Sequence, residues 1–207
     1  MVWYGIFDKE KIMNYPKIIL LRHGETKWNV EGRFQGRLNS PLTPKGELQA
    51  KENALKLKKY IDNFDNIKIF ASPLGRAKDT AYIICDELGI DRGKIIFDNR
   101  IIEFNYGVFE GKIRKDILNQ KDFQDREANK WSYQIKNGES YELVEKRVKD
   151  FLDYISDEKK IIIVAHEMVN RTIRGVYCNY DKSTILNLKQ PNNMILFLKD
   201  KGEKILT

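Results

Sequence analysis

Ile18-Ile19-Leu20-Leu21-Arg22-His23-Gly24-Glu25-Thr26 is the stretch that decides the fold of this 207-residue chain. Its four leading apolar residues predict a short buried strand, and the polarity changes abruptly at Arg22. A strand that ends in a cation, an imidazole and a glycine delivers reactive groups to one edge of a sheet. In open α/β sheets, ligands bind at that carboxyl-end edge. We therefore expect a ligand site directly after this strand.

The chain contains only two histidines, and both follow strand-like runs. His23 ends the stretch quoted above, and His166 follows Ile161-Ile162-Ile163-Val164-Ala165. The two imidazoles are therefore expected at the same kind of place in the fold. This pattern predicts an enzyme built around the histidine pair.

Length and composition are typical of one globular domain. The apolar runs reach four or five residues, far short of the roughly 20 that span a bilayer. Charged residues within the first fifteen argue against a secretory signal. Cys85 and Cys178 show neither a pairing nor a metal-ligand spacing, as in free thiols of a reducing cytosol. We expect a cytoplasmic protein with no membrane partner, and a homodimer stays open.

The net charge of +7 is spread along the chain. Lysines are scattered among acids, as in Asp157-Glu158-Lys159-Lys160, and basic residues do not interleave repeatedly with aromatic ones. This distribution indicates a solvated surface rather than a nucleic-acid partner. A positive balance also favours the approach of a small anionic substrate.

Strands and helices alternate along the chain. Strands are predicted at 18–21, 67–71, 95–98, 161–165 and 194–198. Helices are predicted from Pro44 to Tyr60 after a Thr43 N-cap, from a Ser72-Pro73 start to Leu88, at 142–154 and at about 168–177. This order predicts an α/β fold, a three-layer α/β/α sandwich around a mostly parallel sheet.

Three segments stand outside this alternation. Residues 1–15 form a predicted N-terminal extension, and residues 16–207 form a single domain. Residues 28–37 form a polar loop with two glycines. Residues 112–140 are polar, lack a clear strand and predict an excursion over the sheet edge, a candidate lid.

Arg76 is predicted in the first turn of a helix, where the helix dipole disfavours a cation. A bound anion would resolve the conflict, because both the dipole and the guanidinium attract it. Glu103 lies in the largely apolar run Ile101-Ile102-Glu103-Phe104. Its carboxyl is expected to be either solvated or desolvated with a raised pKa.

These residues together can carry out phosphoryl transfer. A neutral imidazole is a competent nucleophile, and arginines offer bidentate donors to phosphate oxygens. A second, charged histidine would stabilise the transferring group, and a glutamate in an apolar setting could exchange a proton with the leaving group. No cluster in the sequence suits a metal, so we expect neither a metal nor a cofactor. The candidate set is Arg22, His23, Asn29, Arg76, Glu103 and His166.

Several ordered blocks resemble the signature of the histidine phosphatase superfamily, branch 1, which includes the cofactor-dependent phosphoglycerate mutases. They are Leu21–Thr26 with Asn29, Gln35-Gly36 and Pro41-Leu42-Thr43, then Ser72–Ala77, Glu103–Gly111, Gly138-Glu139-Ser140 and the strand before His166. The resemblance extends from about residue 17 to 199. It implies a phosphoglycerate mutase-like fold.

The resemblance also implies a role for each matching residue. His23 would be phosphorylated transiently, with Arg22, Arg76 and His166 binding the phosphate and Glu103 donating a proton. Asn29 and the Gln35-Gly36 backbone would complete the pocket, while Tyr106 and Arg114 would contact the substrate. Gly24 would keep side-chain bulk out of the phosphate site. The family's usual Ser-His-Gly-Gly is replaced here by Ala165-His166-Glu167-Met168, so Glu167 either weakens anion binding or points away.

Three functions remain open at this point. The interval between Glu103 and His166 is short for the insertion of the classical mutases and holds no adjacent arginine pair, which favours a phosphomonoesterase acting on a small phosphorylated metabolite. A mutase would need 2,3-bisphosphoglycerate as a primer. A weakly active member that binds phosphorylated ligands is the third possibility.

Overall fold

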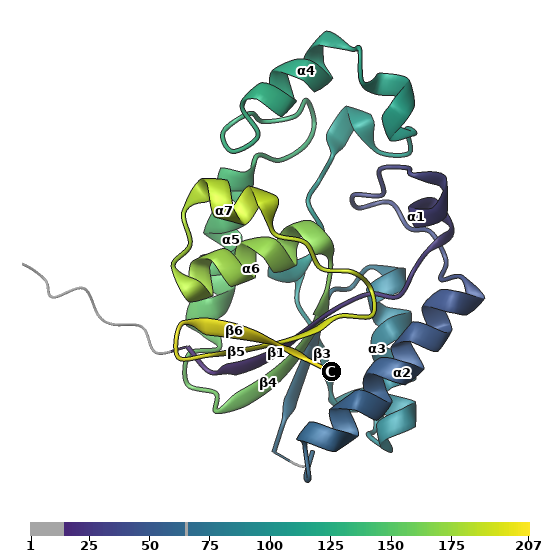
Figure 1. Ribbon diagram of the computed structural model, residues 1–207, viewed down its shortest axis with the longest axis vertical. Helices are drawn as coiled ribbons and strands as arrows, with labels where there is room; N and C mark the ends of the chain where they lie inside the picture. Colours follow the sequence, from purple (N-terminus) through teal and green to yellow (C-terminus); the bar gives the residue numbers. More distant parts are fainter. Residues whose placement is uncertain (1–14, 65) are drawn as a thin grey trace, which may run out of the picture.

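A six-stranded sheet forms the centre of the computed structural model, which describes residues 15–64 and 66–207 (Figure 1). The strands are β1 (Lys17–Arg22), β2 (Lys68–Ala71), β3 (Ile95–Phe97), β4 (Lys160–Ala165), β5 (Ile195–Lys199) and β6 (Gly202–Leu206). Their order is β3-β2-β4-β1-β5-β6. The first four strands along the chain run parallel, and β5 is antiparallel to both of its neighbours. The predicted mostly parallel sheet is confirmed.

Seven α-helices lie within the described residues, and none of them is long and apolar enough to cross a membrane. They are α1 (Lys27–Glu31), α2 (Pro44–Tyr60), α3 (Gly75–Leu88), α4 (Lys121–Ala128), α5 (Tyr141–Tyr154), α6 (Glu167–Cys178) and α7 (Lys182–Asn187). Short 3₁₀ turns span Arg92–Lys94, Asn99–Ile101, Gly107–Phe109 and Arg114–Ile117.

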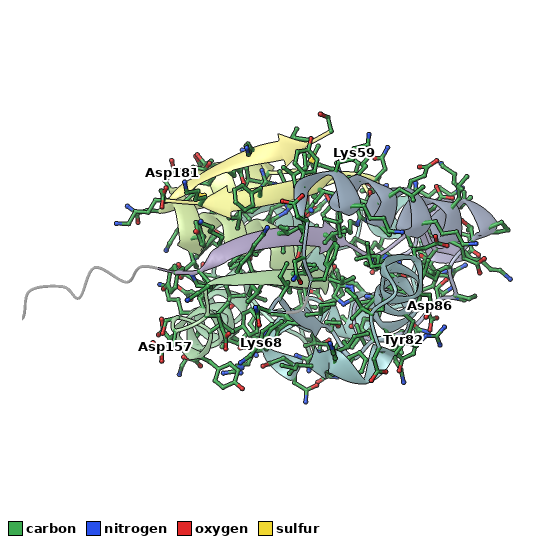
Figure 2. All side chains as sticks on the ribbon, turned by 90° about the horizontal axis from the view of Figure 1, so that it is seen from below. Lys59, Lys68, Tyr82, Asp86, Asp157 and Asp181 are labelled. Atoms are coloured by element: carbon green, nitrogen blue, oxygen red, sulfur yellow. The ribbon has the colours of Figure 1, made fainter. Side chains whose placement is uncertain are left out.

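Alternate residues of β1 face two separate cores, because successive side chains of a strand point to opposite faces. Ile19 and Leu21 pack in the core that includes residues of α2 and α3. Ile18 and Leu20 pack in the core that includes residues of α5 and α6. Figure 1 shows these helix pairs on opposite sides of the sheet. The predicted three-layer sandwich is confirmed, and its surface carries solvent-exposed charges such as Lys59, Lys68 and Asp157 (Figure 2).

Of the two capped helix starts that the sequence predicts, one is confirmed. The Thr43 side chain accepts a hydrogen bond from the Gly46 amide at 3.0 Å, and Pro44 is the first residue of α2. The prediction that Ser72 begins α3 is wrong, because α3 begins at Gly75 and its N-cap is Leu74. Ser72 is buried and hydrogen-bonded to His166 instead. The hydroxyl of Ser72, which could have capped a helix, instead contacts a predicted site residue.

The structure contains two elements that the sequence did not predict, a short helix in the first loop and a sixth strand after β5. The predicted loop at 28–37 begins with the short helix α1. The strand β6 was not predicted, and it pairs with β5 through a two-residue turn. That turn holds Asp200 at φ 50° and Lys201 at φ 58°. Glycine or asparagine usually marks such a turn, so this pair gives little warning of a hairpin.

The excursion at residues 112–140 contains α4 and lies at the far end of the molecule from the sheet (Figure 1). Backbone hydrogen bonds close its base: the Val108 amide donates to Lys136 O at 3.1 Å, and the Glu139 amide donates to Asn105 O at 2.9 Å. A second set joins it to the loop after α1, with Phe34 N donating to Lys112 O at 3.0 Å. The excursion is therefore tied to the rest of the domain at two places.

Of the predicted N-terminal extension, residues 1–14 lie outside the described residues. Tyr15 is described, and its hydroxyl donates to Asp153 Oδ1 at 3.3 Å, while its ring lies 5.9 Å from that of Tyr177. The chain therefore enters the domain along α5 and α6.

Candidate active site

The ends of β1 and β4 bring the two histidines together. The two strands are parallel neighbours with Arg22 opposite Ala165, so the next residue of each chain segment is a histidine at the same level. The rings of His23 and His166 lie 5.2 Å apart between centroids at an angle of 58°. The predicted pairing of the two imidazoles at one sheet edge is present.

The hydrogen bonds of His23 leave one ring nitrogen as a nucleophile. Nδ1 lies 2.7 Å from Gly24 O, and a carbonyl only accepts, so Nδ1 carries the proton. Nε2 therefore holds a lone pair, toward which Arg76 Nε donates at 3.3 Å. Burial, followed by the charges of Arg76 and Arg22, holds the pKa of His23 well below its usual 6.5. The neutral, nucleophilic form thus dominates at neutral pH.

His166 lies behind His23 and is fully buried. Its Nε2 is 2.7 Å from Ser72 Oγ, and its Nδ1 has no hydrogen-bond partner among the described residues. Burial, then the charge of Arg76, keeps the pKa of His166 well below 6.5. The sequence predicts a charged second histidine, whereas burial and the neighbouring arginine favour the neutral form of His166. A dianion bound beside it would favour the protonated form again.

Arg76 lies in the first turn of α3 with its side chain pointing into the site, as its sequence position suggested. It is 1% exposed and donates to Gly36 O at 2.7 Å and to Leu38 O at 2.8 Å. Burial lowers the pKa of Arg76 to about 10, so it stays charged at neutral pH. These carbonyls fix a guanidinium whose fork matches phosphate oxygens.

Gly36 holds the opposite wall in place. Its φ is 53°, and a Cβ added there would lie 1.9 Å from Glu110 Oε1. That carboxylate oxygen accepts from Arg37 N at 2.8 Å and from Tyr106 N at 3.1 Å. Glycine suits this turn, because the positive φ disfavours other residues and a side chain would displace the Glu110 carboxylate.

The sequence left open whether the Glu103 carboxyl is solvated or desolvated, and the structure shows it desolvated. Its side chain lines the pocket although the residue is only 7% exposed, and its Oε1 accepts from the Phe104 amide at 2.8 Å. Burial raises the pKa of Glu103, and the nearby charge of Arg76 partly opposes the rise. A carboxyl in this state keeps its proton to a higher pH than an exposed glutamate does.

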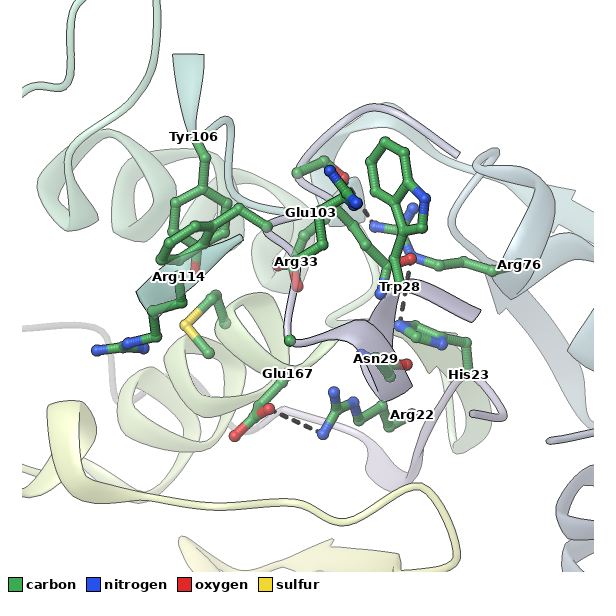
Figure 3. A pocket seen from close by; sticks show the side chains of 15 residues that line it. Arg22, His23, Trp28, Asn29, Arg33, Arg76, Glu103, Tyr106, Arg114 and Glu167 are labelled. Carbon is green, nitrogen blue, oxygen red and sulfur yellow. Dashed lines mark hydrogen bonds and ion pairs between the residues drawn. The ribbon is translucent and has the colours of Figure 1, made fainter. Parts of the chain in front are cut away.

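A cleft of about 290 Å³ joins these groups (Figure 3). The tenth predicted site residue, His166, is buried directly behind the cleft and does not line it. The other nine line the cleft: Arg22, His23, Asn29, Gln35, Gly36, Arg76, Glu103, Tyr106 and Arg114. Asn29 also caps α1, since its Oδ1 accepts from the Thr26 amide at 3.1 Å. Tyr106 is buried, whereas Arg114 is exposed and lies 3.5 Å from Glu127.

Five residues of the lining are absent from the predicted site: Trp28, Gly32, Arg33, Phe34 and Met168. Arg33 belongs to the basic loop at 28–37, which was a usable signal. The aromatic and thioether side chains gave none, because nothing in their spacing separates a pocket wall from a core. Glu167 was named, but its direction was left open. It points to the pocket, with Oε2 2.8 Å from Arg22 Nη1.

The structural requirement for glycine at position 24 differs from the one that the sequence predicts. A Cβ at this position would lie 2.2 Å from Gly46 O, in the first turn of α2. The glycine therefore permits close approach of the strand end and α2, rather than clearing the phosphate site.

The proteins that this chain resembles agree with the geometry of the site. The sequence pattern of the histidine phosphatase superfamily (branch 1) matches residues 18–205. The chain belongs to this superfamily. As a histidine phosphatase family member, it is 34% identical over 193 residues to a Hydrogenobacter thermophilus protein named "Putative phosphoserine phosphatase 2", and the match covers 91% of each chain.

Two further matches extend the picture. An Escherichia coli protein named "Probable phosphoglycerate mutase GpmB" is 43% identical over 122 residues, which is 59% of this chain and 50% of the relative. The match thus spans half the length of that relative. The crystal structure of the α-ribazole phosphatase from Shigella flexneri superimposes with a TM-score of 0.77 at 22% identity, covering 91% of this chain and 94% of that one. This last similarity establishes the fold of the histidine phosphatase.

Proposed function

We propose that the protein is a phosphomonoesterase that hydrolyses a small phosphorylated metabolite through a phosphohistidine on His23. The observation that carries this proposal is the hydrogen bond from Nδ1 of His23 to Gly24 O, which leaves the Nε2 lone pair in a cleft lined by arginines. Membership of the histidine phosphatase superfamily and the full-length match to a phosphatase-named relative support it.

In the first step, the Nε2 lone pair of His23 attacks phosphorus while the bond from phosphorus to the ester oxygen breaks. Arg22 and Arg76 neutralise the phosphoryl oxygens, which is the main contribution that a protein makes to such a transfer. Glu103 gives its proton to the departing oxygen, so the product leaves as a neutral alcohol. The enzyme then carries a phosphoryl group on Nε2, and Glu103 is a carboxylate.

In the second step, water attacks the phosphorus of the phosphohistidine. Glu103 accepts a proton from that water, the bond between nitrogen and phosphorus breaks, and its electron pair returns to Nε2. Inorganic phosphate leaves and Glu103 is protonated again. We place His166 as a donor to a phosphoryl oxygen through Nδ1, its unpartnered nitrogen. The cycle uses only side chains of this chain and needs no cofactor.

A phosphoglycerate mutase is the second candidate, supported by the 43% match to the mutase-named relative. A mutase must shield its phosphohistidine from water and return the phosphoryl group to a second hydroxyl, with 2,3-bisphosphoglycerate as primer. The relative of matched length is named a phosphatase, which favours hydrolysis.

The decisive experiment combines turnover with trapping of the intermediate. We expect the purified protein to release phosphate from p-nitrophenyl phosphate and to carry an acid-labile, base-stable phosphoryl group after rapid quenching. Both signals should vanish in His23→Ala. Conversion of 3- to 2-phosphoglycerate that depends on the bisphosphate would instead establish the mutase. Phosphate binding without any turnover would establish a binding protein.

A further inference from the structure

Glu167 places a carboxylate in a pocket whose proposed ligand is a phosphate dianion. It is the first residue of α6, and its side chain is 21% exposed and faces the cleft beside Arg22 (Figure 3). Its Oε2 lies 2.8 Å from Arg22 Nη1, and its Oε1 lies 3.2 Å from Arg171 Nη2. The phosphoryl-transfer mechanism described above gives this carboxylate no task.

A bound phosphate changes the charge balance around Glu167. Arg22 Nη1 contacts Glu167 Oε2 and also donates to Gln190 O at 3.0 Å, and the phosphoryl oxygens compete for the same guanidinium. Oε2 then faces the cleft next to another anion, a repulsive arrangement in a partly desolvated site. Either a cation moves close to Oε2, or the phosphate binds more weakly.

The other cations of the site are already engaged. Arg171 holds Oε1, but it is buried and also donates to Leu186 O at 2.9 Å, so it stays behind the carboxylate. Arg33 is paired with Glu31 at 2.9 Å, and Arg114 lies 3.5 Å from Glu127. Arg76 is held by Gly36 O and Leu38 O. Each positively charged residue that lines the cleft within the described part of the chain therefore already has a partner of its own. The missing cation can come from the substrate.

We propose that Glu167 is a specificity-determining residue that selects phosphomonoesters bearing an ammonium group close to the ester oxygen. In such a substrate the phosphate takes Arg22, and the ammonium takes the Oε2 position that Arg22 releases. A carboxylate or second phosphate at the same place would face Glu167 and be rejected. This inference rests on the proposed phosphatase function and narrows it to the class of 2-amino phosphomonoesters.

The test compares three phosphate esters of similar size: phosphoethanolamine, propyl phosphate and phosphoglycolate. They carry an ammonium, a methyl group and a carboxylate, respectively, near the phosphate. We expect wild-type kcat/KM for phosphoethanolamine to exceed that for propyl phosphate by at least about tenfold, the size of one charge-assisted hydrogen bond. Phosphoglycolate should be the poorest of the three.

Glu167→Gln removes the charge while keeping the shape of the side chain. We expect it to abolish the preference for phosphoethanolamine and to improve phosphoglycolate, mainly through KM, because the contact is made in the ground state as well. Glu167→Asp should restore part of the preference. Glu142→Gln is the matched control, since Glu142 is an exposed acid in the first turn of α5, outside the cleft.

The outcomes separate the two proposals. Absence of His23-dependent hydrolysis of p-nitrophenyl phosphate would refute the phosphatase function itself. With that hydrolysis present, equal wild-type kcat/KM values for phosphoethanolamine and propyl phosphate would overturn the role of Glu167 without recourse to any variant. A wild-type preference that survives unchanged in Glu167→Gln would overturn it as well.

Discussion

The strands β1 and β4 are parallel neighbours of equal length, and a histidine follows each of them, yet the two ends differ in chemistry. At the end of β1, a backbone carbonyl fixes the proton of His23 on Nδ1 and leaves Nε2 toward the cleft. At the end of β4, a serine hydroxyl holds His166 on Nε2, and the residue is set behind the first. The partner of one ring nitrogen separates the nucleophile from the supporting group.

The residues that follow each histidine differ in the same way. Gly24 lets the end of β1 press against α2, where a Cβ would lie 2.2 Å from Gly46 O. Glu167 instead starts α6 and turns a carboxylate toward the cleft. Equal strand register thus places two imidazoles at one edge, and the next one or two residues decide what each can do.

Exchange of each histidine for glutamine should give the largest difference. We expect His23→Gln to lower kcat by at least about 10⁴-fold and to form no phosphoenzyme, because it removes the nucleophile. His166→Gln should cost about 10²- to 10³-fold, the usual effect of losing one donor to a developing charge. Single-turnover kinetics with acid and alkaline quenching measure both quantities. A labelled phosphoenzyme in His23→Gln would reverse the assignment of the two strand ends.

Glu103→Gln should have the next largest effect, and it should depend on the leaving group. We expect a loss of about 10²- to 10⁴-fold for an alkyl phosphate, and a much smaller one for p-nitrophenyl phosphate, whose phenolate leaves without a proton.

The raised pKa of Glu103 also sets a pH dependence. Because the protonated carboxyl donates the proton, kcat/KM should be high below this pKa and fall as pH rises through it. The lowered pKa of His23 means that its protonation causes no loss near pH 6.5. Glu103→Gln should remove the alkaline limb and keep the ionisation of the substrate. An unchanged alkaline limb in this variant would exclude Glu103 as the proton donor.

Gly24→Ala tests the packing that sets the end of β1 apart. We expect it to destabilise the fold by about 2 kcal/mol, since the added methyl meets a backbone oxygen that can yield only with the helix. Urea denaturation measures the free energy of unfolding. Gly93→Ala is the control, because its Cβ would meet an Asp91 side-chain oxygen no closer than 3.2 Å. Equal destabilisation by both variants would show that the clash is not the cause.

Ser72→Ala should have the smallest effect, and it tests the hydrogen bond that orients His166 after β4. The substitution leaves both ring nitrogens of His166 without a partner, so the ring loses its fixed orientation. We expect kcat to fall about tenfold, the loss of about one hydrogen bond, with phosphoenzyme formation retained. Stopped-flow measurement of the burst and the steady state distinguishes the two. A loss as large as that of His23→Gln would give Ser72 a direct catalytic role.

Much of this arrangement could be predicted from the sequence because apolar runs ending in polar residues define the carboxyl edge of the sheet. The histidine pair followed from that rule, and Arg76 followed from the unfavourable position of a cation in the first turn of a helix. The roles of Ser72 and Glu167 could not, since one capping side chain and one helix-initiating acid look the same whether they face solvent or a site. The hairpin of β5 and β6 escaped because Asp200 and Lys201 take positive φ without a glycine. The path of residues 112–140 depends on long-range contacts that no local pattern encodes.

The closed base of the excursion has a consequence for how such an enzyme can be altered. Hydrogen bonds between residues 105–108 and 136–139 hold the two ends of this segment side by side, and a second set joins it to the loop after α1. A length of chain from another superfamily member could therefore replace the segment if the loop after α1 is exchanged with it. Such a chimaera could change the substrate specificity while His23, Arg76 and His166 keep their positions.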